Sequence, residues 1–317
     1  MTATVELSRR EAWLTAVRPQ TLPAGAAPVL MGVGLAVADG VFEPWPAVAA
    51  LVGALLIQIG TNLANDYYDA LKGADTDERE GFTRVTAGGL IDPDRVKQAM
   101  ALTYALALVV GASLVYVGGL PIVIIGLSGI LAGLLYTGGP YPYGYYGLGD
   151  LFVFVYFGLV AVAGTYYVQA VVALDAGLFP LWIPDGTVTV AAVLAGVAAG
   201  ALATAILVVN NVRDRETDRE AGKRTLAVIL GYRYSRVEFG ALLVAAYAVP
   251  VVLWVGFGYT PAVVLAWLSV PLAIQVGRVV ATRTDGEALN PALEQTGKLF
   301  ALYAVLFTAG LAVGVVL

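Results

Sequence analysis

The sequence contains no cysteine and no histidine. Without cysteine, the chain has no disulfide, no thiolate metal site and no cysteine nucleophile. Without histidine, it lacks the side chain that most often acts as a base near neutral pH and most often binds transition metals. Any chemistry must therefore depend on carboxylates, amides, tyrosines, lysines and arginines.

Charged residues are also scarce. They make up 13% of the chain, against 59% hydrophobic residues, and the mean hydropathy is +0.80. Several apolar runs reach the roughly 20 residues that a helix needs to cross a bilayer. We therefore expect an all-α, polytopic membrane protein that forms a single domain over residues 1–317, is surrounded by membrane lipid and has no nucleic-acid partner.

Apolar runs predict nine transmembrane helices, and these runs are rich in glycine and alanine at spacings that favour close helix packing. Residues 1–20 carry charges and lack the apolar core of a signal peptide, so we expect an amphipathic lead-in that lies along the membrane surface. The nine runs are 21–38, 45–65, 98–117, 120–137, 151–174, 188–211, 238–256, 260–281 and 299–317.

The distribution of basic residues gives an orientation. Nine crossings place all 18 lysines and arginines on the side of the N-terminus, in residues 1–20, 65–97, 212–237 and 278–298. Positive charge is enriched on the cytoplasmic side of membrane proteins. We therefore expect a multi-pass protein of the cell membrane with a cytoplasmic N-terminus.

Two acidic motifs end two of the apolar runs. The first, "NLANDYYDALKGADTDE", covers residues 62–78, and the second, "NNVRDRETDRE", covers residues 210–220. Four helices separate them, so both motifs should lie on the same membrane face, as in a parallel repeat of two four-helix units followed by a ninth helix. If the helices continue through the motifs, Asn62, Asp66 and Asp69 share one face, as do Asn210 or Asn211 with Asp214 and Asp218.

Carboxylates that face one another across a cavity repel unless a cation lies between them. Hard oxygen ligands without histidine or cysteine favour Mg²⁺ or Ca²⁺, and Mg²⁺ commonly completes its coordination with water and substrate phosphate. We therefore expect a phosphorylated substrate, with nearby basic residues available to bind it. The candidates are Lys72, Arg84, Lys223 and Arg224; the alternative for these, and for Arg213, Arg215 and Arg219, is a topology signal or a contact with lipid headgroups. The neighbouring Asp77, Glu78, Glu80, Glu216 and Glu220 fall in charge runs that could equally be solvated.

Several motifs of the chain together resemble those of a known family. The two motifs, together with "RPQTLPAGAAPVLMG", "RVTAGGL", "LYTGGPYPYGYYGLGDLFVFVYFG" and "LNPALEQTGKLFALY", are similar to those of the UbiA superfamily of intramembrane prenyltransferases. Within it they resemble the MenA type, which prenylates 1,4-dihydroxy-2-naphthoate in menaquinone synthesis. The resemblance covers Arg18 to Tyr303.

The resemblance implies nine helices around a central cavity with a side opening for a lipid tail, where Mg²⁺ and the diphosphate of a polyprenyl donor bind. Its motifs assign metal binding to Asn65, Asp69, Asp75, Asp214 and Asp218. Asp75 is shifted from the commoner superfamily spacing, Asp66 is an addition of the MenA type with a catalytic role, and Asn211 binds substrate.

The available groups indicate a mechanism. Metal and basic residues neutralise the diphosphate, the allylic C–O bond ionises, and the aromatic ring attacks the allyl cation. Tyr136 is expected to stabilise that cation through its ring, whereas Tyr141, Tyr143 and Tyr145 are expected to lie in an interfacial belt. The naphthoate acceptor loses CO₂ and gives demethylmenaquinone, and either Arg18 or Arg84 binds its carboxylate.

Two other functions remain alternatives. A glycerol-phosphate lipid prenyltransferase would share both aspartate motifs but lack the combination of "KGADT", "RVTAGGL" and "YTGGP". A cation-coupled transporter could use aspartates within the membrane, although here the aspartates lie at helix ends on one face. Pyrophosphate release from a prenyl diphosphate would separate an enzyme from a transporter.

Overall fold

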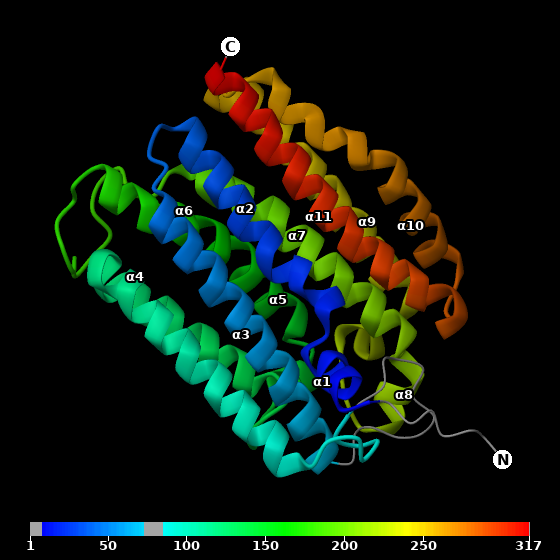
Figure 1. The fold of residues 1–317 in the computed structure, drawn as a ribbon. Coiled ribbons are helices and arrows are strands. Elements are labelled where there is room, and N and C mark those ends of the chain that lie inside the picture. The colour runs from blue at the N-terminus through cyan, green and yellow to red at the C-terminus, as the bar shows by residue number, and fades with distance from the viewer. Residues whose placement is uncertain (1–7, 73–84, 317) are drawn as a thin grey trace.

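The computed structural model describes residues 8–72 and 85–316, and no β-strand occurs among them. These residues form a bundle of long, roughly parallel and antiparallel helices (Figure 1). The all-α class predicted from the sequence is confirmed. The elements are α1 (Arg9–Val17), η1 (Pro19–Thr21), α2 (Leu22–Ala38), α3 (Pro44–Leu71), α4 (Pro93–Leu135), η2 (Tyr143–Tyr146), α5 (Gly149–Val153), η3 (Phe154–Val160), α6 (Ala161–Ala173), α7 (Val190–Arg213), α8 (Arg215–Glu220), α9 (Leu226–Phe257), η4 (Pro261–Ser269), α10 (Val270–Thr282) and α11 (Gly286–Val316).

Eight stretches of the described residues are long and apolar enough to cross a membrane, so the chain is a multi-pass membrane protein. One of them, α4, has 43 residues and is interrupted at Gly119, whose backbone is not helical (φ 60°, ψ −148°). The two halves of α4 fold back on each other. The contact between Gly133 and Tyr104 shows this, since an added Cβ on Gly133 would lie 2.8 Å from the tyrosine hydroxyl. Counting α4 twice gives nine crossings, in line with the nine predicted runs.

The turn at Gly119 requires glycine for two reasons. Its positive φ is strained for residues with a side chain, and an added Cβ would lie 2.0 Å from the carbonyl oxygen of Pro180. The loop before α7 closes over this turn through two backbone hydrogen bonds, Leu120 N–H to Pro180 O (2.9 Å) and Phe179 N–H to Tyr116 O (3.2 Å).

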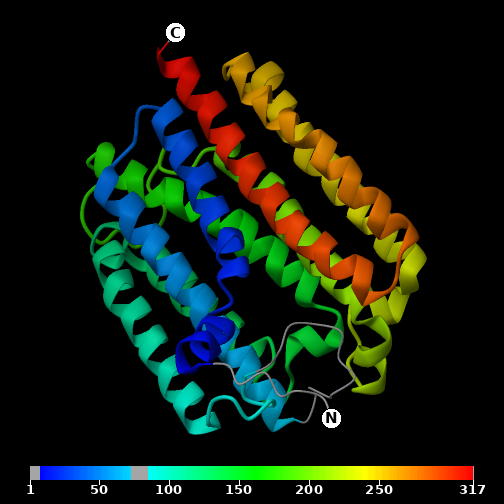
Figure 2. The ribbon, with the colours of Figure 1, turned by 45° about the vertical axis from the view of Figure 1, so that its right-hand side comes forward.

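Helix α7 lies at the centre of the bundle, with α2, α3 and α4 on one side and α9, α10 and α11 on the other (Figures 1 and 2). Its alanines and glycines are buried and allow close approach, as expected for helices in lipid. The closest approach is to the π-helical segment η3, where a Cβ on Gly158 would lie 2.4 Å from the Cα of Gly200. The prediction of close packing by small residues is confirmed there, while the two four-helix repeats stay a prediction.

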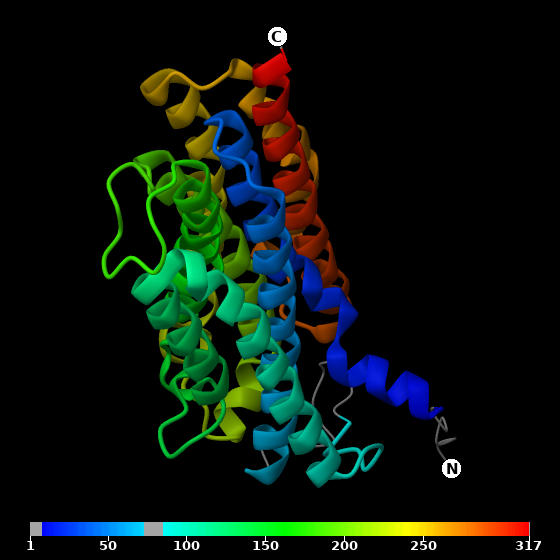
Figure 3. The same ribbon diagram turned by 60° about the vertical axis from the view of Figure 1, so that its left-hand side comes forward.

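The N-terminal lead-in is helical over α1, which begins with a capping box between Ser8 and Glu11. Figure 3 shows α1 leaving the bundle at an angle to α2. Ala12 and Ala16 are buried in a cluster with Leu63 and Ala64 of α3. Helix α1 therefore packs beside the end of α3 that carries the first acidic motif.

Candidate active site

Two cavities meet inside the bundle. The polar cavity, about 240 Å³, lies near the ends of α3 and α7, and the apolar cavity, about 590 Å³, lies between α2, α3, α4, η3 and α6. Five residues line both cavities, which are therefore adjoining: Gln58, Asn65, Tyr136, Val153 and Phe157.

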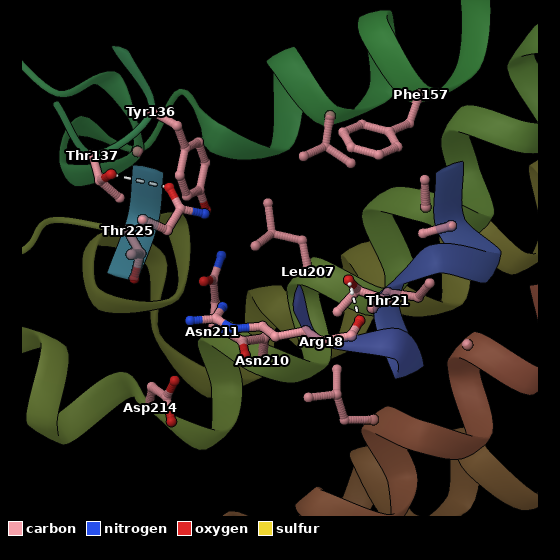
Figure 4. A pocket seen from close by; sticks show the side chains of 18 of the residues that line it. Arg18, Thr21, Tyr136, Thr137, Phe157, Leu207, Asn210, Asn211, Asp214 and Thr225 are labelled. Carbon is pink, nitrogen blue, oxygen red and sulfur yellow. Dashed lines mark hydrogen bonds between the residues drawn. The ribbon is translucent and has the colours of Figure 1, made fainter. Parts of the chain in front are cut away.

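Both acidic motifs contribute to the polar cavity, which confirms that four intervening crossings bring them to one end of the molecule. Its wall includes nine of the residues predicted from the sequence or named beside them: Arg18, Asn65, Asp69, Tyr136, Asn210, Asn211, Asp214, Asp218 and Lys223. Figure 4 shows Tyr136 and Asn211 entering this cavity from different elements.

The first motif is carried by α3, which continues to Leu71 and so past the end of the apolar run. The carboxylate of Asp69 is almost fully buried, with 1% exposure. It accepts a hydrogen bond from the hydroxyl of Tyr145 (2.6 Å) and lies 3.9 Å from the ammonium of Lys223. The Oδ1 atom of Asn65 accepts a hydrogen bond from the hydroxyl of Thr137 (3.0 Å), and the residue lines the polar cavity.

Asp66 faces a different part of the protein. Its buried carboxylate accepts hydrogen bonds from the backbone N–H groups of Val85 (3.1 Å) and Thr86 (3.0 Å) and from the hydroxyl of Thr86, and it lies 4.0 Å from the guanidinium of Arg18. Among the described residues, it is not part of the polar cavity wall. Asp66 therefore fixes Val85 and Thr86 against α3, a contact that the shared-face hypothesis did not include.

The second motif does not lie on one continuous helix. Helix α7 ends at Arg213, Asp214 follows the break, and Asp218 lies on the short α8. The expectation of an unbroken helical face is wrong here, although both aspartates still reach the cavity. The backbone N–H of Asp218 donates to the carbonyl of Asp214 (2.7 Å), which keeps the two residues one turn apart.

Asp214 forms a bidentate ion pair with Arg213. The Nε and Nη2 atoms of Arg213 each donate to Asp214 over 2.7 Å, and the guanidinium also donates to Asn210 (2.8 Å) and Asn290 (2.9 Å). Arg213 is buried, so a topology signal at the membrane surface does not describe it. A spacing pattern alone could not show this, because the partner Asn290 lies at the start of α11.

Lys223 connects the two motifs. Its ammonium lies 3.9 Å from carboxylate oxygens of both Asp69 and Asp218, and 4.8 Å from the ring centre of Tyr145. Lys72 has different partners from Lys223. Its ammonium donates hydrogen bonds to the backbone carbonyls of Thr137 and Gly139. Partial loss of hydration lowers the pKa of Lys72, and Asp69 opposes that shift.

The remaining predicted residues have different surroundings. Among the described residues, neither Lys72 nor Arg224 lines the polar cavity, and Arg224 is exposed while its backbone N–H donates to Tyr145 O (2.8 Å). Asp75 and Arg84, like Asp77, Glu78 and Glu80, lie outside the described residues. Arg18 lines the cavity with a left-handed backbone (φ 55°), a conformation that is uncommon for a residue with a side chain.

The tyrosines after α4 do not form an interfacial belt. Tyr143 donates to the carbonyl of Ala132 (2.8 Å), stacks on Phe152 and lines the apolar cavity, and Tyr145 binds Asp69. The belt hypothesis is wrong for these two, whereas Tyr141 is 78% exposed. Tyr136 lines both cavities as expected for a ring beside the reaction centre, and it packs edge-on against Tyr143 with ring centres 5.4 Å apart.

The donor set suits a hard divalent cation. Every candidate ligand in the polar cavity is a carboxylate or amide oxygen, which is what Mg²⁺ prefers. No group of three or more acidic side chains converges on one point among the described residues. A bound ion would therefore take one or two carboxylates and fill its remaining positions from water and substrate, as Mg²⁺ commonly does.

Comparisons with known proteins agree with this geometry. The sequence profile described as the UbiA prenyltransferase family matches residues 26–303. The 1,4-dihydroxy-2-naphthoate octaprenyltransferase of Escherichia coli K12 is 37% identical, with 96% of each chain covered. Two solved structures share the fold: the apo UbiA homologue of Aeropyrum pernix K1 (15% identity, TM-score 0.67, 92% of this chain and 97% of that one) and the UbiA homologue of Archaeoglobus fulgidus bound to DMAPP and Mg²⁺ (18% identity, TM-score 0.56, 94% and 99%).

Proposed function

This chain belongs to the UbiA prenyltransferase family, and on that premise we propose that it transfers a polyprenyl group from a polyprenyl diphosphate to 1,4-dihydroxy-2-naphthoate. Diphosphate and CO₂ leave, and the product is demethylmenaquinone in its quinol form, an intermediate of menaquinone synthesis. The observation that carries the proposal is the junction at Asn65 and Tyr136 between a carboxylate-lined cavity and a larger apolar one. A substrate with a charged head and a long apolar tail matches this pair of cavities.

The diphosphate end belongs in the polar cavity. Asp69, Asp214 and Asp218, with Asn65 and Asn211, are the oxygen-bearing groups that would hold Mg²⁺ there. The bound ion would supply Lewis acidity toward the diphosphate leaving group. The structure of the Archaeoglobus fulgidus homologue bound to DMAPP and Mg²⁺ supports the same metal here. Lys223 is placed to donate directly to diphosphate oxygens.

The prenyl tail belongs in the apolar cavity, whose wall is formed by Gly, Ala, Val, Leu, Ile and aromatic side chains of four membrane-spanning segments. The reacting allylic carbon then lies at the junction, next to the ring of Tyr136. An aromatic face stabilises a neighbouring cation by about 0.5–2 kcal/mol. Tyr136 thus favours ionisation of the C–O bond without becoming bonded to the substrate.

The acceptor ring attacks the allyl cation at the carbon that bears the carboxylate. A C–C bond to the prenyl group forms, the C–CO₂ bond breaks, and its electron pair restores the aromatic ring. The carboxylate charge and the allyl cation cancel, so no proton has to be removed. Arg18, which lines the polar cavity together with Lys223, would bind this carboxylate before the reaction.

The sidedness follows from the charge distribution. All 18 lysines and arginines fall on the side of the two motifs when nine crossings are counted, and positive charge favours the cytoplasm. We place the protein in the cell membrane with the N-terminus and the polar cavity toward the cytoplasm. A water-soluble naphthoate and the diphosphate head would both reach the site from that side.

Mass analysis of products tests this function. Purified protein would receive Mg²⁺, a prenyl diphosphate and, in separate reactions, 1,4-dihydroxy-2-naphthoate, 4-hydroxybenzoate or a glycerol-phosphate lipid. We expect product only with the naphthoate, lighter than simple prenyl addition by the mass of CO₂. A product that keeps its carboxylate, or consumption of the glycerol-phosphate lipid alone, would overturn the assignment of the acceptor.

A further inference from the structure

Gln58 of α3 was not singled out by its sequence, yet it occupies a distinctive position. It is only 7% exposed and lines both the polar and the apolar cavity. Its Oε1 atom is buried and accepts no hydrogen bond from any residue that the structure describes. A buried acceptor without a donor destabilises a folded protein, so this atom needs a partner that the described residues do not supply.

The orientation of the Gln58 amide follows from its neighbours. The backbone carbonyl of Val17 can only accept, so Asn62 must direct its Nδ2 toward it (2.9 Å) and its Oδ1 away. That Oδ1 can also only accept, and it faces Gln58 Nε2 (3.4 Å). The amide nitrogen of Gln58 is therefore held by this chain of contacts, and Oε1 is the end that remains.

A threonine completes the network. The hydroxyl of Thr21 donates to the carbonyl of Arg18 (2.9 Å) and accepts from Asn62 (2.9 Å) and from Gln58 (3.2 Å). These bonds hold the left-handed turn at Arg18 against α3. Every other polar side-chain atom of Thr21, Asn62 and Gln58 has a partner in this network, so within these three side chains Oε1 of Gln58 is the atom that lacks one among the described residues.

The chemistry of the substrates decides what can satisfy this oxygen. Diphosphate and carboxylate groups are hydrogen-bond acceptors at neutral pH, and a polyprenyl chain has no donor. A dihydroxylated aromatic ring carries O–H donors. Of the substrate groups that the proposed reaction brings to these cavities, the ring hydroxyls are the hydrogen-bond donors that complement Gln58 Oε1.

The position of Gln58 along α3 agrees with this match. Gln58, Asn62, Asn65 and Asp69 follow one another at spacings of four, three and four residues, so they lie on one face of the helix. Gln58 lies about 16 Å from Asp69 and about 10 Å from Asn65 along the helix axis. A bicyclic ring fits in that interval, with its reacting carbon near the junction of the cavities.

We propose that Gln58 binds the aromatic acceptor, its Oε1 accepting a hydrogen bond from one ring hydroxyl and so orienting the ring toward the prenyl carbon. This inference rests on the proposed function, because the acceptor is taken to be a hydroxylated arene. It assigns to Gln58 the preference for rings that carry a hydroxyl over rings of the same shape that lack one. A site built to bind a hydroxyl discriminates strongly against the analogue without it.

The test compares binding of ring analogues to wild-type and variant protein. Calorimetry on the purified full chain in detergent, with Mg²⁺ and inorganic diphosphate, would give the Kd of 1,4-dihydroxy-2-naphthoate, 1-hydroxy-2-naphthoate and 4-hydroxy-2-naphthoate. We expect the wild type to bind one monohydroxy analogue about tenfold more weakly than the dihydroxy compound. In Gln58→Met that ratio should fall to about one, because the variant keeps the side-chain length and loses the acceptor.

The control is Gln20→Met, which changes the same residue type at an exposed position of the polar cavity wall. It should keep the tenfold ratio. Gln58→Leu replaces Gln58→Met if the latter does not fold. A wild-type ratio of one for both analogues, or a ratio that persists in the Gln58 variants, would refute the role of Gln58 while leaving prenyl transfer intact. Absence of naphthoate binding and turnover in the wild type would instead refute the proposed function, and the inference with it.

Discussion

The ammonium of Lys223 lies 3.9 Å from a carboxylate oxygen of Asp69 and 3.9 Å from one of Asp218. One cation thus compensates an acidic side chain from each motif. Carboxylates that face each other across a cavity repel, and a cation between them offsets that repulsion. The position of Lys223 therefore marks where positive charge is required, and in the proposed function Mg²⁺ and Lys223 divide that task around the diphosphate.

Metal removal gives the first prediction. Because the candidate ligands are carboxylate and amide oxygens, prenyl transfer should need Mg²⁺ or Mn²⁺, should stop in excess EDTA and should return when Mg²⁺ is added back. Pyrophosphate release measures this directly. Full turnover in excess EDTA would contradict the proposal that a metal ion binds the diphosphate.

The second prediction concerns Asp69 and Asp218. Changing either to Asn should lower kcat/KM by about 100-fold or more, since each removes a charge that faces the diphosphate. Thermal stability should fall only moderately, because Asn keeps the size of the Asp side chain and an oxygen that can still accept a hydrogen bond. Glu220→Gln on the exposed end of α8 is the matched control and should keep nearly full activity. Equal losses at all three positions would indicate general charge balance rather than a site.

Asp214 should behave differently from the other two aspartates. Its removal leaves the buried guanidinium of Arg213 without its bidentate partner, and breaking a buried ion pair costs about 3–5 kcal/mol. We expect Asp214→Ala to lose stability as well as activity, as measured by denaturation in detergent. Glu216→Gln, at a half-exposed carboxylate that pairs with Arg215 and Arg219, should cost less than about 1 kcal/mol. Equal stability losses in the two variants would contradict the buried pair.

Tyr145 provides a prediction that separates it from the neighbouring surface tyrosine. Tyr145→Phe removes the 2.6 Å hydrogen bond to Asp69, and a hydrogen bond to a charged group contributes about 1.5–3 kcal/mol. The Mg²⁺ concentration for half-maximal activity should rise about tenfold or more. Tyr141→Phe, at a side chain that is 78% exposed, should leave it unchanged. Identical titrations of the two variants would show that the Tyr145 hydroxyl does not support the metal site.

The apolar cavity predicts control of tail length. An added Cβ at Gly126 meets no atom within 4 Å, and this residue lines the apolar cavity. Gly126→Leu should therefore fold and shorten the longest prenyl diphosphate that is used efficiently, as read from product masses with donors of increasing length. Gly240→Leu is the control, because Gly240 also has open space but does not line that cavity. The same cut-off in both variants would place the tail elsewhere.

Much of the fold could be predicted because the features that determine it, the apolar runs and the positions of the two motifs, lie in short continuous stretches of the sequence. Apolar runs give the crossings, and the two motifs end runs separated by an even number of crossings. The turn at Gly119 was visible only as a short gap between two runs, and the structure shows it to be a hairpin without a polar loop. The break after Arg213 was not predicted, because nothing in "NNVRDRETDRE" disfavours a continuous helix.

The residues that the sequence missed depend on contacts between distant segments. Tyr145 and Asp69 are separated by 76 positions, and the pairing of Arg213 with Asn290 by 77. Asp66 resembles its neighbours in the motif, yet its partners come from residues 85–86. A motif identifies the residue types that a reaction needs, but only the packing shows which of them reach the cavity.

The hairpin within α4 also constrains biosynthesis. At its turn, the backbone N–H of Leu120 and the carbonyl of Tyr116 form hydrogen bonds with residues 179–180, which the ribosome adds some sixty residues later at its ordinary pace of about 5–20 residues per second. Until those residues are made, the two hydrogen bonds across the turn cannot form. The loop before α7 therefore closes over the hairpin of α4 only after a delay of seconds.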